Sequence, residues 1–155
     1  MPLSYGSNFP AYYFTVPEDE LEKRVEFDDE ICVIDDEFFF IRGCLDIPIL
    51  DGGDENLFTW NVWCSLSRTS FERILENWEN ANRVDDPPCF GWLNTSLPGY
   101  PETLTLKTNV VTRELGMRPF VELEPTVHPL AIEQRTGITL QRVQEIAEIV
   151  LHNER

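Results

Sequence analysis

Within the segment Leu57–Leu66, every second residue from Phe58 onward is apolar. A period of two is typical of a strand that buries one face. Upstream, Ile31–Ile34 and Phe38–Ile49 flank a short acidic turn, a pattern that predicts a β-hairpin. Gly43 and Pro48 in the second arm indicate a bulge and an edge position.

Apolar residues three and four positions apart predict two amphipathic helices. In the first, Thr69 and Glu72 form a capping box and the apolar stripe continues to Trp78. The second runs from about Leu140 to His152 and is capped by Thr139.

Shorter patterns complete the prediction. Pro17–Arg24 and His128–Gln134 are expected to be short helices, the latter with Gly137 at its exit. Further strands are expected at Phe90–Asn94, Thr103–Thr112 and Phe120–Leu123, and an irregular aromatic segment at residues 1–16. We therefore predict a single α+β domain over residues 1–155. A mostly antiparallel sheet of about five or six strands would carry two or three helices on one face.

The composition adds a strong charge imbalance. The chain carries 28 Asp and Glu residues against 12 Lys and Arg residues, a formal net charge of −16 in 155 residues. Such a charge repels nucleic acid and anionic membranes and attracts basic proteins. We expect a basic protein partner, and neither nucleic acid nor membrane. Because no apolar stretch reaches the roughly 18 residues that span a bilayer and no secretory signal opens the chain, we expect a cytoplasmic protein with free thiols.

Acids and aromatic residues are the candidates for contacting such a partner. The loops on either side of the second hairpin arm would present acids together at one edge of the sheet and so steer a basic protein. An exposed aromatic ring near them would add a recognition surface, although such rings more often fill the core. The candidate residues are Asp35, Asp36, Glu37, Asp51, Asp54, Glu55, Trp63, Trp92 and Tyr100.

A second set of residues suggests a different kind of site. Arg42 and Arg118 lie in or beside strands, where an arginine can hold an acid or an anionic ligand. His128 follows an acidic strand and could act as a general base near Trp92. The competing interpretations are a structural salt bridge for the arginines and a helix cap for the histidine, and both are commoner.

Motifs for catalysis, metals and cofactors are missing. Cys32, Cys44, Cys64 and Cys89 lack the spacing of zinc ligands, and neither a nucleophile elbow nor a phosphate-binding glycine loop occurs. The stretch Leu130–Val143 superficially resembles a helix-turn-helix, but the acids that follow it oppose phosphate contacts. We predict no catalytic residue, no metal ligand and no cofactor.

Several short segments together resemble a bacterial family catalogued as domain of unknown function 2199. They include Pro10-Ala-Tyr-Tyr13, Phe39-Phe-Ile-Arg-Gly43, Trp63-Cys-Ser-Leu-Ser67, Leu97-Pro-Gly-Tyr-Pro101 and His128–Ile138. The resemblance covers nearly the whole chain. Many members of the family begin with a Cys-x-x-Cys-Gly segment that looks like a zinc knuckle. This sequence lacks that segment, so the resemblance implies membership without a metal role or an activity.

The leading hypothesis is a non-enzymatic acidic binding protein, such as an immunity-type protein that neutralises a basic protein toxin. The alternative is a small-ligand-binding protein or an enzyme with a pocket near His128, Arg118 and Trp92.

Overall fold

Two long strands form the centre of the fold. In the computed structural model, which describes residues 2–153, β4 (Phe38–Pro48) and β5 (Leu57–Leu66) pair antiparallel along their whole lengths. The bounds of β5 confirm the strand predicted from its alternating pattern. Residues 1, 154 and 155 of the predicted domain lie outside the described part of the chain.

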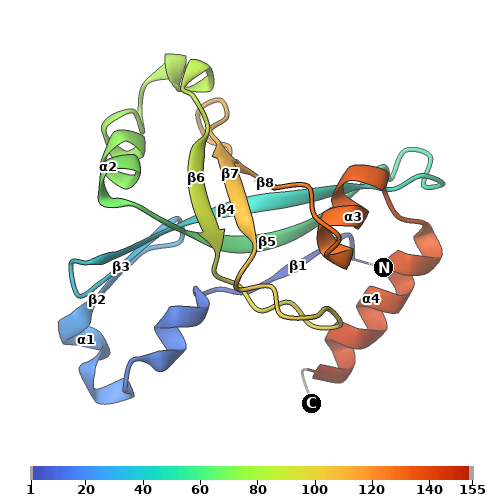
Figure 1. Ribbon diagram of the computed structural model, residues 1–155, viewed down its shortest axis with the longest axis horizontal. Coiled ribbons are helices and arrows are strands. Elements are labelled where there is room, and N and C mark those ends of the chain that lie inside the picture. The colour runs from blue at the N-terminus through green and yellow to red at the C-terminus, as the bar shows by residue number, and fades with distance from the viewer. Residues whose placement is uncertain (1, 154–155) are drawn as a thin grey trace.

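Six further strands extend this hairpin into one sheet (Figure 1). They are β1 (Ser4–Gly6), β2 (Val25–Phe27), β3 (Ile31–Ile34), β6 (Cys89–Leu93), β7 (Lys107–Val111) and β8 (Phe120–Leu123). The order is β1-β5-β6-β7-β8-β4-β3-β2, and β4 also pairs with β5. The β1–β5 and β4–β8 pairings are parallel and the others are antiparallel.

The fold is therefore α+β and mostly antiparallel as predicted, but the expected open sheet needs correction. Because β4 contacts both β5 and β8, strands β4 to β8 close into a five-stranded barrel. Closure occurs at Gly43: a Cβ atom there would lie 2.6 Å from Cγ2 of Val121 and 2.9 Å from the carbonyl oxygen of Pro119. The edge position predicted from Pro48 is confirmed for strand pairing, since within residues 2–153 β5 is the only strand that pairs with Pro48, and the carbonyl oxygen of Pro48 accepts from the N–H of Ile138 at 2.8 Å.

The apolar core fills the inside of the barrel. The inward positions of β5, from Phe58 to Leu66, are all buried, as their period of two predicted. Helix α2 (Arg68–Glu76) lies at one end of the long hairpin, and α3 (Pro129–Thr136) and α4 (Leu140–Asn153) lie at the other (Figure 1).

Helix boundaries follow local hydrogen bonds. Ser67, and not Thr69, caps α2, because its Oγ accepts from the N–H of Ser70 at 3.2 Å. The Thr139 cap is confirmed, since its Oγ1 accepts from the N–H of Arg142 at 3.2 Å. Gly137 ends α3 with a φ of 87°, which glycine adopts without strain.

A second, smaller core lies on the outer face of the sheet. Residues 1–16, expected to be irregular, contain β1 and the short helix η1 (Ala11–Thr15). The short helix expected at Pro17–Arg24 is present as η2 (Glu18–Glu20) followed by α1 (Leu21–Arg24). These N-terminal elements cover a cluster of side chains that point to the outer face of the sheet. The buried members of this cluster are Val16, Cys32, Ile34, Phe40 and Trp63.

Candidate functional site

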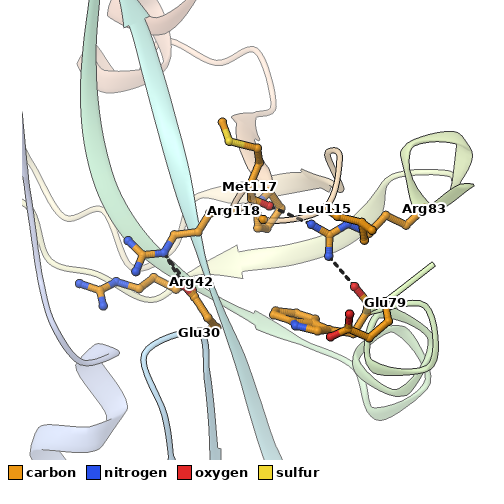
Figure 2. Close-up of a pocket in the computed structure, with 10 residues that line it drawn as sticks. Glu30, Arg42, Glu79, Arg83, Leu115, Met117 and Arg118 are labelled. Atoms are coloured by element: carbon orange, nitrogen blue, oxygen red, sulfur yellow. Dashed lines mark hydrogen bonds and ion pairs between the residues drawn. The ribbon is translucent and has the colours of Figure 1, made fainter. Parts of the chain in front are cut away.

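A pocket lined by charged side chains lies where β4 meets the connection between β7 and β8. This pocket has a volume of about 370 Å³. Its walls include three arginines, Arg42, Arg83 and Arg118, and the acids Glu30 and Glu79 (Figure 2). It contains two of the three residues predicted for the alternative pocket.

Arg83 forms one wall and is a structural residue. It is only 7% exposed, and its guanidinium donates to the carbonyl oxygens of Arg113 (2.6 Å), Glu114 (2.7 Å), Trp78 (2.9 Å) and Met117 (3.2 Å). Within residues 2–153 no carboxylate forms an ion pair with it. Main-chain dipoles therefore stabilise its charge and fix the β7–β8 connection. The sequence gives no signal for this role, since Arg83 lies in a short helical turn, η3 (Ala81–Asp85).

Arg42 and Arg118 form the opposite wall together with Glu30. The Nε of Arg118 donates to both carboxylate oxygens of Glu30, at 2.7 and 2.9 Å. Arg42 makes longer contacts, 3.2–3.3 Å, to neutral oxygens of Ser7, Asn8 and Asp29. Burial lowers the pKa of Arg42, and the neighbouring charge of Arg118 lowers it further. Two positive charges thus share one carboxylate.

His128 does not belong to this pocket, which corrects the predicted grouping with Arg42 and Arg118. Arg118 precedes β8 and His128 follows it, so they lie at opposite ends of that strand. The Nδ1 of His128 accepts from the N–H of Leu130 at 3.1 Å and caps α3. Its Nε2 faces the carbonyl oxygen of Glu102 at 3.1 Å, an arrangement that assigns the proton to Nε2. The helix-cap interpretation fits the structure.

Tyr100 ties a loop to the two C-terminal helices. Its hydroxyl donates to Oε1 of Glu133 at 2.5 Å, while Nε of Arg142 donates to Oε2 at 2.8 Å. Burial raises the pKa of Tyr100, and the carboxylate beside it acts in the same direction. The ring packs against the core, so its hydroxyl is engaged within the protein.

The two uncertain tryptophans have opposite environments. Trp63 is fully buried beneath the N-terminal segment, and its Nε1 donates to the carbonyl oxygen of Ser7 at 3.2 Å. Trp92 is 42% exposed and lies edge-on to Phe90, with a centroid separation of 5.4 Å. Lys107 lies over the Trp92 ring, with Nζ 5.7 Å from its centroid. Of the predicted aromatic contacts, Trp92 is available to a partner and Trp63 is not.

The predicted acidic loops do not form one patch. Asp35, Asp36 and Glu37 precede β4, whereas Asp51, Asp54 and Glu55 follow it. At roughly 3.3 Å per residue, the 11 residues of β4 separate the two loops by about 35 Å. The expectation that one edge presents both loops together is corrected: they mark opposite ends of the molecule.

The first of these loops does gather other acids around it. Arg24 of α1 donates through Nε and Nη2 to both oxygens of Asp35 at 2.8 Å, and holds the pKa of that carboxyl below its usual range. Arg68 of α2 donates to the carbonyl oxygen of Asp36 at 2.6 Å. These bonds bring η2, α1, the β3–β4 turn and α2 together. We call this region the acidic end, with the acids Glu18, Asp19, Glu20, Glu22, Asp35, Asp36, Glu37, Glu72 and Glu76.

Metal and membrane signals are lacking among the residues that the structure describes. No group of three or more His, Cys, Asp or Glu side chains is placed to hold a metal ion. All four cysteines are free thiols. No helix within residues 2–153 has the length and apolar character needed to cross a bilayer.

Comparison with known proteins places the chain in a family without adding chemistry. A family model described as "Uncharacterized protein conserved in bacteria (DUF2199)" matches residues 1–138. The chain belongs to this family. No curated protein and no solved structure matches it. The match confirms the resemblance drawn from the short segments, and it ends just before α4.

Proposed function

We propose that this protein of the DUF2199 family is a non-enzymatic binding protein that captures a basic protein partner through its acidic end. An immunity-type role is the form of this function that we favour, with carboxylates occupying a site where a basic toxin would bind phosphates. Charge complementarity of this kind accelerates encounter and selects against acidic partners.

The observation that carries the proposal is the excess of free carboxylates at the acidic end. The Asp36 side chain is 90% exposed, and its contact with Arg68 is long, at 3.9 Å. Within residues 2–153, Glu18, Asp19, Glu22 and Glu37 form no ion pair, and all four are exposed. A basic partner would supply the missing counter-charges.

The opposite end of β4 supports this role less well. Oδ1 of Asp51 accepts from the N–H of Leu140 at 2.8 Å and so caps α4. Within residues 2–153, Asp54 and Glu55 form no ion pair. No ion pair among the described residues therefore joins their loop to another acidic segment, as happens at the acidic end. This loop therefore provides a matched control site.

The alternative function, a pocket formed by His128, Arg118 and Trp92, receives less support. His128 caps α3, Arg118 pairs with Glu30 before β8, and Trp92 lies exposed on β6. Because the three side chains occupy different parts of the barrel, they do not converge on one substrate.

A pull-down with two matched variants tests the proposal. The first variant is Asp36→Asn with Glu37→Gln, and the control is Asp54→Asn with Glu55→Gln; each removes two negative charges. Asp36 has a φ of 50°, which asparagine tolerates, so the turn is retained.

We expect tagged wild-type protein and the control to retain one stoichiometric basic protein from native lysate, and the first variant to retain much less. Retention should fall between low and moderate salt, because exposed charges are screened. Equal retention by both variants, or a salt-insensitive acidic partner, would contradict the proposal.

A further inference from the structure

We propose that Arg42, Arg113 and Arg118 form a binding site for a small oxyanion of the phosphate or carboxylate type, on the outer face of the barrel beside Cys44. This site is separate from the acidic end and would operate whether or not a protein partner binds there.

The barrel closure brings the three arginines together. Arg42 and Cys44 are two positions apart on β4 and therefore point to the same, outer face. Cys44 is the register partner of Phe120 in β8. The guanidinium of Arg113 lies 3.9 Å from the centroid of the Phe120 ring, and its Nε donates to the carbonyl oxygen of Arg118 at 2.6 Å.

The structure leaves the best anion-binding atoms of two arginines unused. Arg113 and Arg118 each donate to protein oxygens through Nε alone, to a carbonyl oxygen and to Glu30 respectively. Within residues 2–153, the terminal amino groups of these two arginines donate to no protein oxygen. Planar guanidinium groups with free terminal amino groups bind phosphate and carboxylate oxygens in a two-pronged geometry.

Arg42 and Arg118 also point the same way. Figure 2 shows their guanidinium groups side by side, with the terminal nitrogens directed away from Arg83. The side chains of Arg118 and Glu30 are 34% and 32% exposed, so solutes reach this pair. The guanidinium groups of Arg42 and Arg118 therefore line one pocket on the surface.

The local charge favours an anion despite the acidic chain. Of the three guanidinium groups, only that of Arg118 contacts a carboxylate within residues 2–153, that of Glu30. The next outward acid on β4, Asp46, accepts a hydrogen bond from Oγ1 of Thr59 at 2.7 Å. Burial lowers the pKa of Arg42, and the positive charge of Arg118 lowers it further; a bound oxyanion would relieve the repulsion between the two arginines.

A purely structural role explains only part of this arrangement. Holding the β7–β8 connection requires the Nε of Arg113, and the ion pair with Glu30 requires the Nε of Arg118. Neither role requires the terminal amino groups of Arg113 or Arg118. An oxyanion site accounts for both the arginines and their orientation.

NMR of the wild-type protein tests the site without any substitution. Sodium pyrophosphate and sodium citrate are titrated separately into ¹⁵N-labelled protein, with NaCl added to hold the ionic strength constant. We expect saturable shifts of the Nε–Hε signals of Arg113 and Arg118, and no shift for Arg68 at the acidic end. The ligand that saturates at the lower concentration assigns the oxyanion as phosphate or carboxylate.

A conservative variant provides the second measurement. Arg118→Lys keeps the charge and an ion pair with Glu30 but removes the planar fork. We expect it to weaken binding of the better probe at least tenfold, while Arg68→Lys binds like wild type. Shifts that follow ionic strength alone, shifts that do not saturate, or equal affinity in Arg118→Lys would overturn the proposal.

Discussion

The Oδ1 of Asp51, in the loop between β4 and β5, accepts a hydrogen bond of 2.8 Å from the N–H of Leu140, the first residue of α4, although the two lie 89 positions apart. Thr139 satisfies the N–H of Arg142 in the same turn. Asp51 therefore acts as a helix cap supplied from a distant loop, and its negative charge suits the N-terminal end of the helix dipole.

Removing this cap should destabilise the protein. We expect Asp51→Ala to lower the free energy of unfolding by about 1 kcal/mol, the usual effect of losing a capping side chain. Asp54→Ala, in the same loop, should change it by less than about 0.5 kcal/mol. Urea denaturation followed by circular dichroism measures both, and equal effects would show that the cap contributes nothing.

Arg83 should be far less tolerant of substitution than an exposed arginine. Arg83→Met leaves four carbonyl oxygens around a buried position without their donor. We expect a loss of about 3 kcal/mol or more in unfolding free energy. Arg68→Met, at an exposed position with long ion pairs, should cost less than about 1 kcal/mol. Thermal and urea unfolding compare them, and a small effect at Arg83 would refute its structural role.

Acrylamide quenching should distinguish the four tryptophans. Trp92 is 42% exposed, whereas Trp60 and Trp63 are at most 1% exposed. Among single Trp→Phe variants, Trp92→Phe should cause the largest loss of quenchable fluorescence. Trp63→Phe should leave quenching nearly unchanged. If Trp63→Phe reduced it most, the N-terminal segment could not be covering that ring.

Buried thiols should make stability depend on alkaline pH. Burial raises the pKa of Cys64 to about 12 from an ordinary value of 9.0, so the folded state favours the neutral thiol. This contribution is complete below pH 9 and is lost as pH rises toward 12. The slope for one such thiol is about 1.4 kcal/mol per pH unit.

Cys64→Ala removes part of a buried side chain and should lower the free energy of unfolding at pH 7. Because it also removes the ionising thiol, the free energy of unfolding should decline less steeply above pH 9 than in the wild type. Cys32, whose pKa burial also raises to about 12, is unchanged in this variant, so the difference between the two curves isolates Cys64. Urea denaturation at intervals from pH 7 to 11 measures the curves. Parallel curves would contradict the assigned environment of the thiol.

Local pattern predicted most elements of the fold but not their closure. The period of two in β5 and the stripe of α4 depend on residues close in sequence, so the strand and the helix were predicted. The barrel depends on a single register pair between β4 and β8, Cys44 with Phe120, which no local pattern encodes. β1 has only three residues, too few to show a period.

The candidate site residues also divide into those that the local sequence predicts and those that depend on contacts between distant segments. His128 was predictable as a cap because the atoms that it contacts include the nearby N–H of Leu130. The burial of Trp63 was not, since its cover comes from the N-terminal segment. Arg42 and Arg118 are candidates by residue type, but only the barrel closure shows that they lie side by side in the pocket with Glu30.

The most direct test of the acidic end is the association rate of the purified basic partner, measured by stopped-flow at several salt concentrations. Asp36→Asn with Glu37→Gln should slow association several-fold at low salt, and the difference from wild type should shrink as salt rises. Asp54→Asn with Glu55→Gln should slow it much less. If the two variants slowed association equally, or neither did, the acidic end would not be the surface that captures the partner.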